Sequence, residues 1–197
     1  GREPWRSAAA LCWQTGQTYE NIPEKDPLLQ QAWQKKINAP QSSSVGRLFD
    51  AAAALTGMRC LASFEGQGPM ELEALANGAD RYIETELEVC NKLLITNWQS
   101  LLPAMLDSTL TINERACLLH QSLAQALLQQ ALAIRETHTI NTVSFAGGVF
   151  QNRVLTERAM ALLSAAGFKV YLPELIPVND AGISFGQIVE HGFSQQE

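Results

Sequence analysis

A strand, a glycine turn, a helix and a second strand follow one another over residues 142–172, and this segment most constrains the fold. Residues 142–146 are a short strand-like stretch before Gly147-Gly148, residues 151–166 repeat apolar side chains at helical spacing, and residues 169–172 are strand-like again. Two strands joined by such a helix are parallel, because only a long crossover returns the chain to the same end of a sheet. The sequence therefore predicts an α/β fold with a short parallel βαβ unit.

The rest of the chain is predicted to be mainly helical. Pro4 suits the first turn of a helix, where its absent N–H costs nothing, and Asp26 suits a helix cap. Alternation at 82–89, with a partner at 93–95, indicates one antiparallel hairpin. We expect helices over residues 4–13, 26–37, 45–56, 69–77, 98–106, 113–138 and 183–191. The chain is thus expected to be one helix-rich unit over 1–197, mostly helical at 1–110 and α/β at 111–197.

The charge balance argues against several classes of protein. The net charge is −6, and the longest basic cluster is only Lys35-Lys36. Nucleic acids and anionic membranes bind clustered cations, so neither is an expected partner. A membrane-spanning helix needs about 18 consecutive apolar residues, and the sequence has no such run and no signal peptide. A cytoplasmic location is predicted.

The cysteines show no metal-binding pattern. Cys12, Cys60, Cys90 and Cys117 form no CxxC pair, and their spacings match no zinc-ligand motif. We expect all four to be buried, reduced thiols rather than disulfides.

Gly147-Gly148 is the first candidate site. In an open α/β sheet, ligands bind where the carboxyl ends of strands meet the starts of helices. Glycine there allows a positive φ and a close approach of ligand to backbone, and the following helix is expected to direct unpaired N–H groups at a phosphate. Asn152, expected in the first turn of that helix, would add an amide contact. Taken alone, an ordinary tight turn remains the alternative.

Two further groups are candidates. Asp180 precedes the last predicted helix, where a carboxylate is either a helix cap or a ligand for a metal or a magnesium–nucleotide complex. Asp50 lies mid-helix among apolar residues, which is costly unless it is satisfied or functional. Together with Gly46, Gly66 and Glu71 it would form a second wall around a nucleoside, or else only a helix packed through alanine and a turn.

The histidines do not suggest a catalytic base. His120, His138 and His191 are scattered and are expected near helix surfaces. None of them has a partner that would make it a general base or a metal ligand. A serine–histidine or cysteine–histidine mechanism therefore has no support in the sequence.

Several motifs considered together resemble one family. The motifs are, in order, residues 43–51 (SSVGRLFDA), 64–67 (FEGQ), 70–76 (MELEALA), 145–152 (FAGGVFQN) and 177–187 (PVNDAGISFGQ). The opening Arg2-Glu3-Pro4-Trp5-Arg6 fits the same family, so the resemblance covers nearly the whole chain. The chain resembles the C-terminal part of HypF, the carbamoyltransferase of nickel–iron hydrogenase maturation.

The resemblance implies a fold and an activity. The chain is similar to the last part of the TsaD-like module, which would make it part of one lobe of an actin/Hsp70-type ATPase fold. Such enzymes make carbamoyl-adenylate from carbamoyl phosphate and ATP. They then pass the carbamoyl group to the C-terminal cysteine of a partner, HypE, so the enzyme needs no cysteine of its own.

The resemblance also implies roles for residues. Gly147, Gly148 and Asn152 would contact the nucleotide. Asp50 would face the ribose or phosphates, and Gly46 would belong to the same wall. Gly66 and Glu71 would border the nucleoside, although Glu73 aligns nearly as well. Asp180 would bind a divalent metal, of the magnesium or iron type, shared with histidines of an HxxxH-type motif in a lobe that this sequence does not contain.

The sequence departs from the family pattern at two turns. Ala181 stands where the family usually has the first glycine of Asn-Asp-Gly-Gly, which predicts a slightly different turn. Ala146 replaces a common serine, and the lost hydroxyl would cost one phosphate hydrogen bond, about 1 kcal/mol net.

Two other functions remain open at this point. One is a sugar-kinase-like ATPase lobe of the same fold, and the other is a helical interaction domain without activity. The chain starts at Gly1 without an initiator methionine, and we expect a fragment of a larger protein. Such a fragment should lack carbamoyl transfer activity by itself, and it should have an apolar face that is exposed or paired in a homodimer.

Overall fold

The chain has a helix-rich α/β fold. The computed structural model describes residues 2–20, 22–23, 27–78 and 80–194. In order, the elements are α1 Pro4–Thr15, α2 Pro27–Gln34, α3 Val45–Leu55, α4 Gln67–Leu75, β1 Glu86–Cys90, β2 Leu93–Asn97, η1 Gln99–Leu101, α5 Leu102–Leu106, α6 Ile112–His138, β3 Thr142–Ser144, η2 Gly148–Gln151, α7 Arg153–Ala165, β4 Lys169–Tyr171, η3 Asp180–Gly182 and α8 Ile183–Ser194.

The predicted βαβ unit is present. β3 and β4 pair in parallel, with Val143 opposite Val170, and α7 connects them. The helix begins later than predicted, at Arg153, because a 3-10 turn (η2) follows Gly147. The predicted hairpin is confirmed as β1 paired with β2, but β1 begins at Glu86 rather than residue 82.

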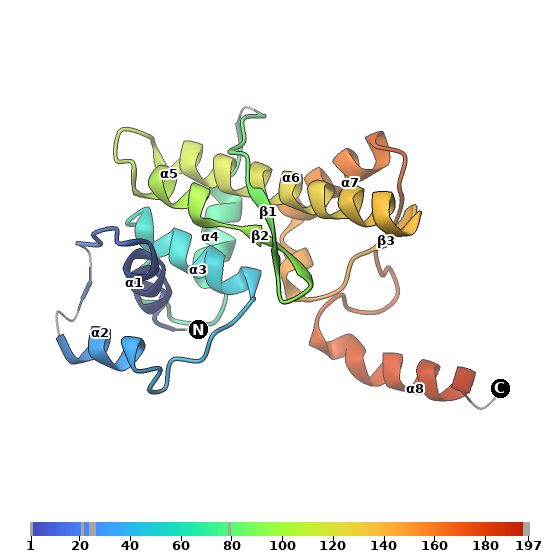
Figure 1. Ribbon diagram of the computed structural model, residues 1–197, viewed down its shortest axis with the longest axis horizontal. Helices are drawn as coiled ribbons and strands as arrows, with labels where there is room; N and C mark the ends of the chain where they lie inside the picture. The colour runs from blue at the N-terminus through green and yellow to red at the C-terminus, as the bar shows by residue number, and fades with distance from the viewer. Residues whose placement is uncertain (1, 21, 24–26, 79, 195–197) are drawn as a thin grey trace.

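Helix α6 joins the two parts of the molecule. It begins at a capping box, in which Thr111 accepts from the N–H of Glu114 and the Glu114 side chain accepts from the N–H of Thr111. It is in contact with α4, α5 and β2 and also with α7, and Figure 1 shows it running across the molecule from α5 to α7. The proposed division after residue 110 falls just before this helix, and both parts share one core.

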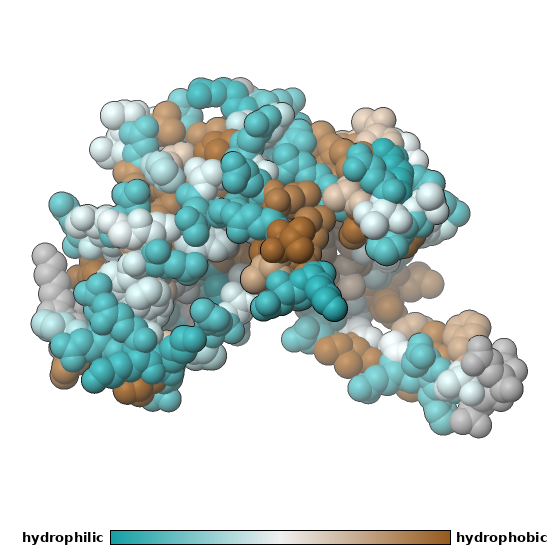
Figure 2. Space-filling model, viewed as in Figure 1, coloured by the Kyte–Doolittle hydropathy of each residue, from teal (hydrophilic) through white to brown (hydrophobic). Residues whose placement is uncertain are grey.

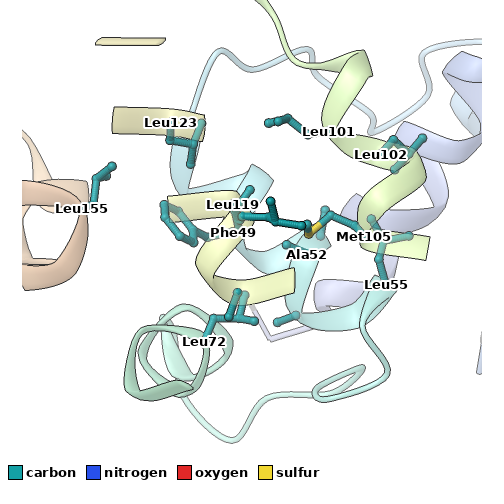
Figure 3. Close-up of a cluster of buried hydrophobic side chains, with 14 of the residues drawn as sticks. Phe49, Ala52, Leu55, Leu72, Leu101, Leu102, Met105, Leu119, Leu123 and Leu155 are labelled. Carbon is teal, nitrogen blue, oxygen red and sulfur yellow. The ribbon is translucent and has the colours of Figure 1, made fainter. Parts of the chain in front are cut away.

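The core gathers at the crossing of α3, α4, α6 and α7. Phe49, Leu72, Leu119 and Leu155 are almost completely buried, and they come from these four helices (Figure 3). The alanines of α3 are buried against α1, where small side chains let the two helices approach closely. On the α4 side, a Cβ at Gly68 would lie 2.7 Å from the Cβ of Ala53, so only glycine fits there.

Some predictions at the level of single residues are wrong. His120 was expected near a helix surface, yet it is completely buried, because it lies on the apolar stripe of α6 four residues after Ala116. Cys12 and Cys117 are buried as expected, but Cys60 is half-buried and Cys90 is exposed at the end of β1. None of the four forms a disulfide. The predicted cap at Asp26 lies outside the described residues.

An exposed apolar surface is present, as expected. No residue of α8 is buried, and Figure 1 shows this helix extending away from the rest of the molecule. Brown surface marks α8 and the β1–β2 hairpin in Figure 2. The exposed apolar side chains of α8 are Ile183, Phe185, Ile188, Val189 and Phe193. None of the helices in the described ranges combines the length and apolar character needed to span a bilayer.

Candidate functional site

The Gly147-Gly148 turn lies at the carboxyl end of β3. Gly147 has φ +110° and ψ 152°, a conformation that is essentially restricted to glycine. Its N–H donates to the carbonyl of Val178 at 2.7 Å, and a Cβ at Gly148 would lie 3.8 Å from that of Asn179. The structure therefore brings the two turns that follow β3 and β4 into contact, as their common position at the carboxyl edge predicted.

The second turn presents Asp180 at the surface. Asn179 caps this turn, since its side chain accepts from the N–H of Ala181 at 3.1 Å. The alternative role considered for Asp180 was a helix cap, and in the structure Asn179 has that role. Asp180 is exposed at the start of η3. Among the described residues no group of three or more histidines, cysteines or acidic residues is arranged to hold a metal ion. Asp180 therefore fits a metal only as one ligand of a site completed by other groups.

Helix α3 lies next to η2 and forms the neighbouring wall. Gly46 is half-buried in the first turn of this helix. Asp50 is only 2% exposed, and its Oδ2 lies 2.8 Å from Nη1 of Arg47 without the angular geometry of a hydrogen bond. Burial raises the pKa of Asp50, while Arg47 opposes that shift. The Asp50 carboxylate has almost no surface with which to contact a ribose or phosphate, whereas the side chain of Arg47 beside it is half-buried and 38% exposed.

Arg47 is a residue of this wall that the candidate residues from the sequence did not include. Its guanidinium lies between Asp50 and Glu65, which is 3.5 Å away and adjoins Gly66. Gly66 caps α4 with φ +83°, so this glycine has the left-handed conformation. The arginine thus connects the start of α3 to the turn before α4. An arginine followed three residues later by an aspartate on one helix was the available signal.

The two glutamates of α4 have different positions. Glu71 forms an ion pair with Arg59 at 2.6 Å and accepts from Gln67 at 3.0 Å, and the hydrogen bonds from Arg59 lower its pKa. Glu73 instead accepts from the N–H of Arg153 at 2.8 Å, at the start of α7. Of the two alternatives for the nucleoside border, the structure places Glu73 next to the glycine turn.

Backbone N–H groups at the start of α7 already donate hydrogen bonds to side chains of the same chain. Asn152 is the cap, and its Oδ1 accepts from the N–H of Leu155 at 2.9 Å. Its Nδ2 lies 2.9 Å from Nε2 of His120. The expectation that this helix offers unpaired N–H groups to a phosphate is therefore wrong for Arg153 and Leu155, because Glu73 and Asn152 accept from them.

His120 is the buried residue behind this site. Its ring packs against Phe49, with ring centroids 5.0 Å apart, and its Nδ1 lies 2.7 Å from the carbonyl of Ala116. Burial lowers the pKa of His120, so the imidazole is neutral at neutral pH. Reading the apolar stripe of α6 through position 120 would have revealed it.

Comparisons with known proteins agree on one family. The family model described as "Carbamoyltransferase, Kae1-like Domain, second subdomain" matches residues 1–187. Carbamoyltransferase HypF2 of Cupriavidus necator is 32% identical over 95% of this chain and 27% of its own length. Carbamoyltransferase HypF of Rhodobacter capsulatus is 36% identical over 94% of this chain and 25% of its own length. The chain thus spans about a quarter of these two relatives.

Solved structures of similar proteins have the same fold. Full-length HypF in the phosphate- and nucleotide-bound form superposes with a TM-score of 0.86 at 31% identity, covering 94% of this chain and 26% of that one. HypF of T. kodakarensis superposes with a TM-score of 0.74 at 23% identity, covering 99% of this chain and 28% of that one. The chain belongs to the Kae1-like carbamoyltransferase domain of the HypF family and corresponds to the second subdomain of that domain.

Proposed function

We propose that the chain supplies one side of the nucleotide site of a HypF-type carbamoyltransferase. The observation that carries the proposal is the contact between the two turns, made by the hydrogen bond from Gly147 to Val178, with Asn179 close to Gly148. It gathers a glycine backbone that a ligand can approach and an exposed carboxylate, Asp180, at one edge of the β3–β4 sheet. The similar full-length HypF is described in a phosphate- and nucleotide-bound form.

The chemistry proposed for the whole protein is transfer of a carbamoyl group. Carbamoyl phosphate and ATP supply a carbamoyl-adenylate, and the thiolate of the C-terminal cysteine of a HypE-like partner attacks its carbamoyl carbon. The bond from that carbon to the phosphate oxygen breaks, and AMP leaves with the electron pair. This chain would hold the adenylate at Gly147-Gly148 and shield the phosphate charge. No cysteine of this chain is required, and Cys12 and Cys117 have pKa values raised by burial, which makes them poor nucleophiles.

A divalent metal, such as magnesium or iron, is proposed to be shared with the other part of the protein. Asp180 is the residue of this chain that would bind it, and the other ligands would come from outside the described residues. When bound, such an ion would neutralise charge on the phosphates. What this chain contributes is the position of the carboxylate, which the cap made by Asn179 and the contact of Val178 with Gly147 set.

The apolar surface of α8 suggests a contact in the assembled protein. We propose that either the rest of a longer HypF-type protein or a second copy of the chain covers it. An exposed apolar surface of this kind is typical of a protein–protein contact. The oligomeric state of the 197-residue chain, measured by sedimentation, separates the two: a dimer that Phe193→Glu dissociates supports a second copy, and a monomer supports the remaining part of a longer protein.

Thermal unfolding in the presence of ADP or ATP and Mg²⁺ tests the nucleotide site. We expect the nucleotide to raise the unfolding temperature of the protein at its natural length, and Gly148→Arg to abolish that rise by filling the turn. Ala161→Arg is the matched control, because it adds the same charge at an exposed position of α7 eight residues beyond the start of the helix. If neither variant changes the response to millimolar nucleotide, the ligand does not bind at this turn.

The activity of the chain by itself provides a second test. We expect no carbamoyl transfer from carbamoyl phosphate and ATP to a peptide ending in the HypE-type cysteine, because among the described residues Asp180 is the one candidate metal ligand at these turns. Labelling of that peptide, detected by mass spectrometry with the 197-residue chain alone, would contradict the proposed division of the site.

A further inference from the structure

His120 lies where three candidate parts of the site meet. It is on α6 with no exposed surface, and it packs against Phe49, next to Asp50 on α3. Its Nε2 contacts Asn152 between η2 and α7. Glu73 of α4, which binds the N–H of Arg153, is the charged group that acts on it electrostatically. A buried polar side chain at such a junction requires a reason, because an apolar residue would fill the space at lower cost.

The hydrogen-bond network fixes which atoms of His120 and Asn152 donate and which accept. The carbonyl of Ala116 can only accept, so Nδ1 of His120 carries the proton and Nε2 is an acceptor. The N–H of Leu155 donates to Oδ1 of Asn152, which leaves the Nδ2 of that amide to donate to His120. The two assignments agree with each other. Both the Nδ2 and the Oδ1 atom of Asn152 therefore make a hydrogen bond inside the chain.

The same residue ends the glycine turn. The N–H of Asn152 donates to the carbonyl of Val149, and the N–H of Phe150 donates to the carbonyl of Gly147. The start of the turn is fixed by the bond from Gly147 to Val178. The position of the turn therefore depends on an anchor at each end, and the anchor at Asn152 is held by His120.

We propose that His120 is a positioning residue for the nucleotide, holding Asn152 through Nε2 so that Gly147-Gly148 keeps its orientation. Asn152 then contributes to binding through the geometry of the turn and not through a direct amide contact. This inference rests on the proposed nucleotide site. It assigns a role to a residue that would otherwise be counted as part of the core.

Two substitutions separate the two hydrogen bonds of the imidazole. The amide of glutamine can reach the position of Nε2, so His120→Gln keeps the contact with Asn152 and gives up the one with Ala116. The amide of asparagine reaches only the position of Nδ1, so His120→Asn does the reverse. Each variant loses one hydrogen bond and the ring packed on Phe49, and His120→Asn also leaves the larger space in the core.

The readouts are the affinity for Mg²⁺–ADP by calorimetry and the amide hydrogen exchange of residues 145–152, both in the protein at its natural length. We expect His120→Asn to bind about five- to tenfold more weakly, the effect of one hydrogen bond of about 1 kcal/mol or slightly more. Exchange in the turn should also be faster. His120→Gln should stay within about twofold of the wild type, well below the effect of one such bond. Equal affinities and equal exchange in the two variants would overturn the proposal.

A third variant guards against poor folding of His120→Asn. Serine is a good helix cap but is too short to reach His120, so Asn152→Ser should reproduce the loss of affinity and the faster exchange. Unchanged values for this variant would also reject the inference. Wild-type protein that fails to bind Mg²⁺–ADP would reject the proposed nucleotide site instead, and the exchange data would still decide whether His120 positions the turn.

Discussion

The two turns at the site are supported in very different ways. Behind Gly147, helix α7 buries Leu155, Thr156, Ala159 and Leu163, and polar side chains accept hydrogen bonds from the N–H groups of Arg153 and Leu155. Behind Asp180, helix α8 buries no residue at all. The difference indicates that the Gly147-Gly148 turn is held in place by this chain alone. The position of Asp180 instead depends on packing that the described residues do not supply.

Truncating one apolar side chain in each region should give the largest contrast. Leu155→Ala removes a side chain that is 1% exposed, and we expect a loss of about 2–5 kcal/mol in the free energy of unfolding. Ile188→Ala on α8, where Ile188 is 71% exposed, should change it by less than about 0.5 kcal/mol. Urea unfolding of both variants measures this contrast. A large loss for Ile188→Ala would show that α8 is packed against something in solution.

Alanine at one glycine in each region should give effects of opposite sign. Gly147→Ala forces a Cβ into the conformation at φ +110°, and we expect a loss of about 1–3 kcal/mol. Gly192→Ala in α8 has open space for the Cβ and improves helix propensity, so a gain of up to about 1 kcal/mol is expected. Thermal unfolding compares them. A neutral Gly147→Ala would mean that the turn relaxes and is not held as described.

The sequence predicted the βαβ unit and both turns because their signals are local. Gly147 directly follows a strand-like stretch and precedes a helical pattern, and its positive φ agrees with that prediction. The sequence could not predict that Glu73 accepts a hydrogen bond from the N–H of Arg153, because these residues are 80 positions apart. For His120 the sequence was informative only in part. Its helical spacing could have predicted that it is buried, but no local pattern predicts that its partner is Asn152.

The candidate site residues also differ in how far local sequence patterns predict their positions. Gly147, Gly148 and Asp180 lie at one edge, as the order of strand and helix predicted. Asp50 was recognised as an unusual residue, but its orientation into the core depends on how α3 packs, which no local pattern encodes. Direct contact of each candidate with nucleotide or metal stays a prediction.

Removing the cap in each region should give a smaller contrast. Asn152→Ala removes the acceptor for Leu155 and leaves His120 buried without its partner, so we expect a loss of about 1–2 kcal/mol. Asn179→Ala affects only the exposed bond to Ala181, and a loss below about 0.5 kcal/mol is expected. Denaturant midpoints with equal slopes would measure both. Equal losses would contradict the stronger support of the glycine turn.

The smallest expected effect is the pH dependence that His120 adds to stability. Burial lowers its pKa below the ordinary value of 6.5, so between the two values the unfolded chain binds a proton that the folded chain excludes. The contribution of the neutral imidazole is therefore complete above pH 6.5 and decreases as the pH falls toward the folded pKa. We expect His120→Gln to lose this decrease when unfolding is measured between neutral and mildly acidic pH. Asp50, whose pKa burial raises, has the opposite slope, but it is present in both proteins and cancels in their difference. Identical slopes would mean that the folded chain tolerates protonation of His120 as well as the unfolded chain does.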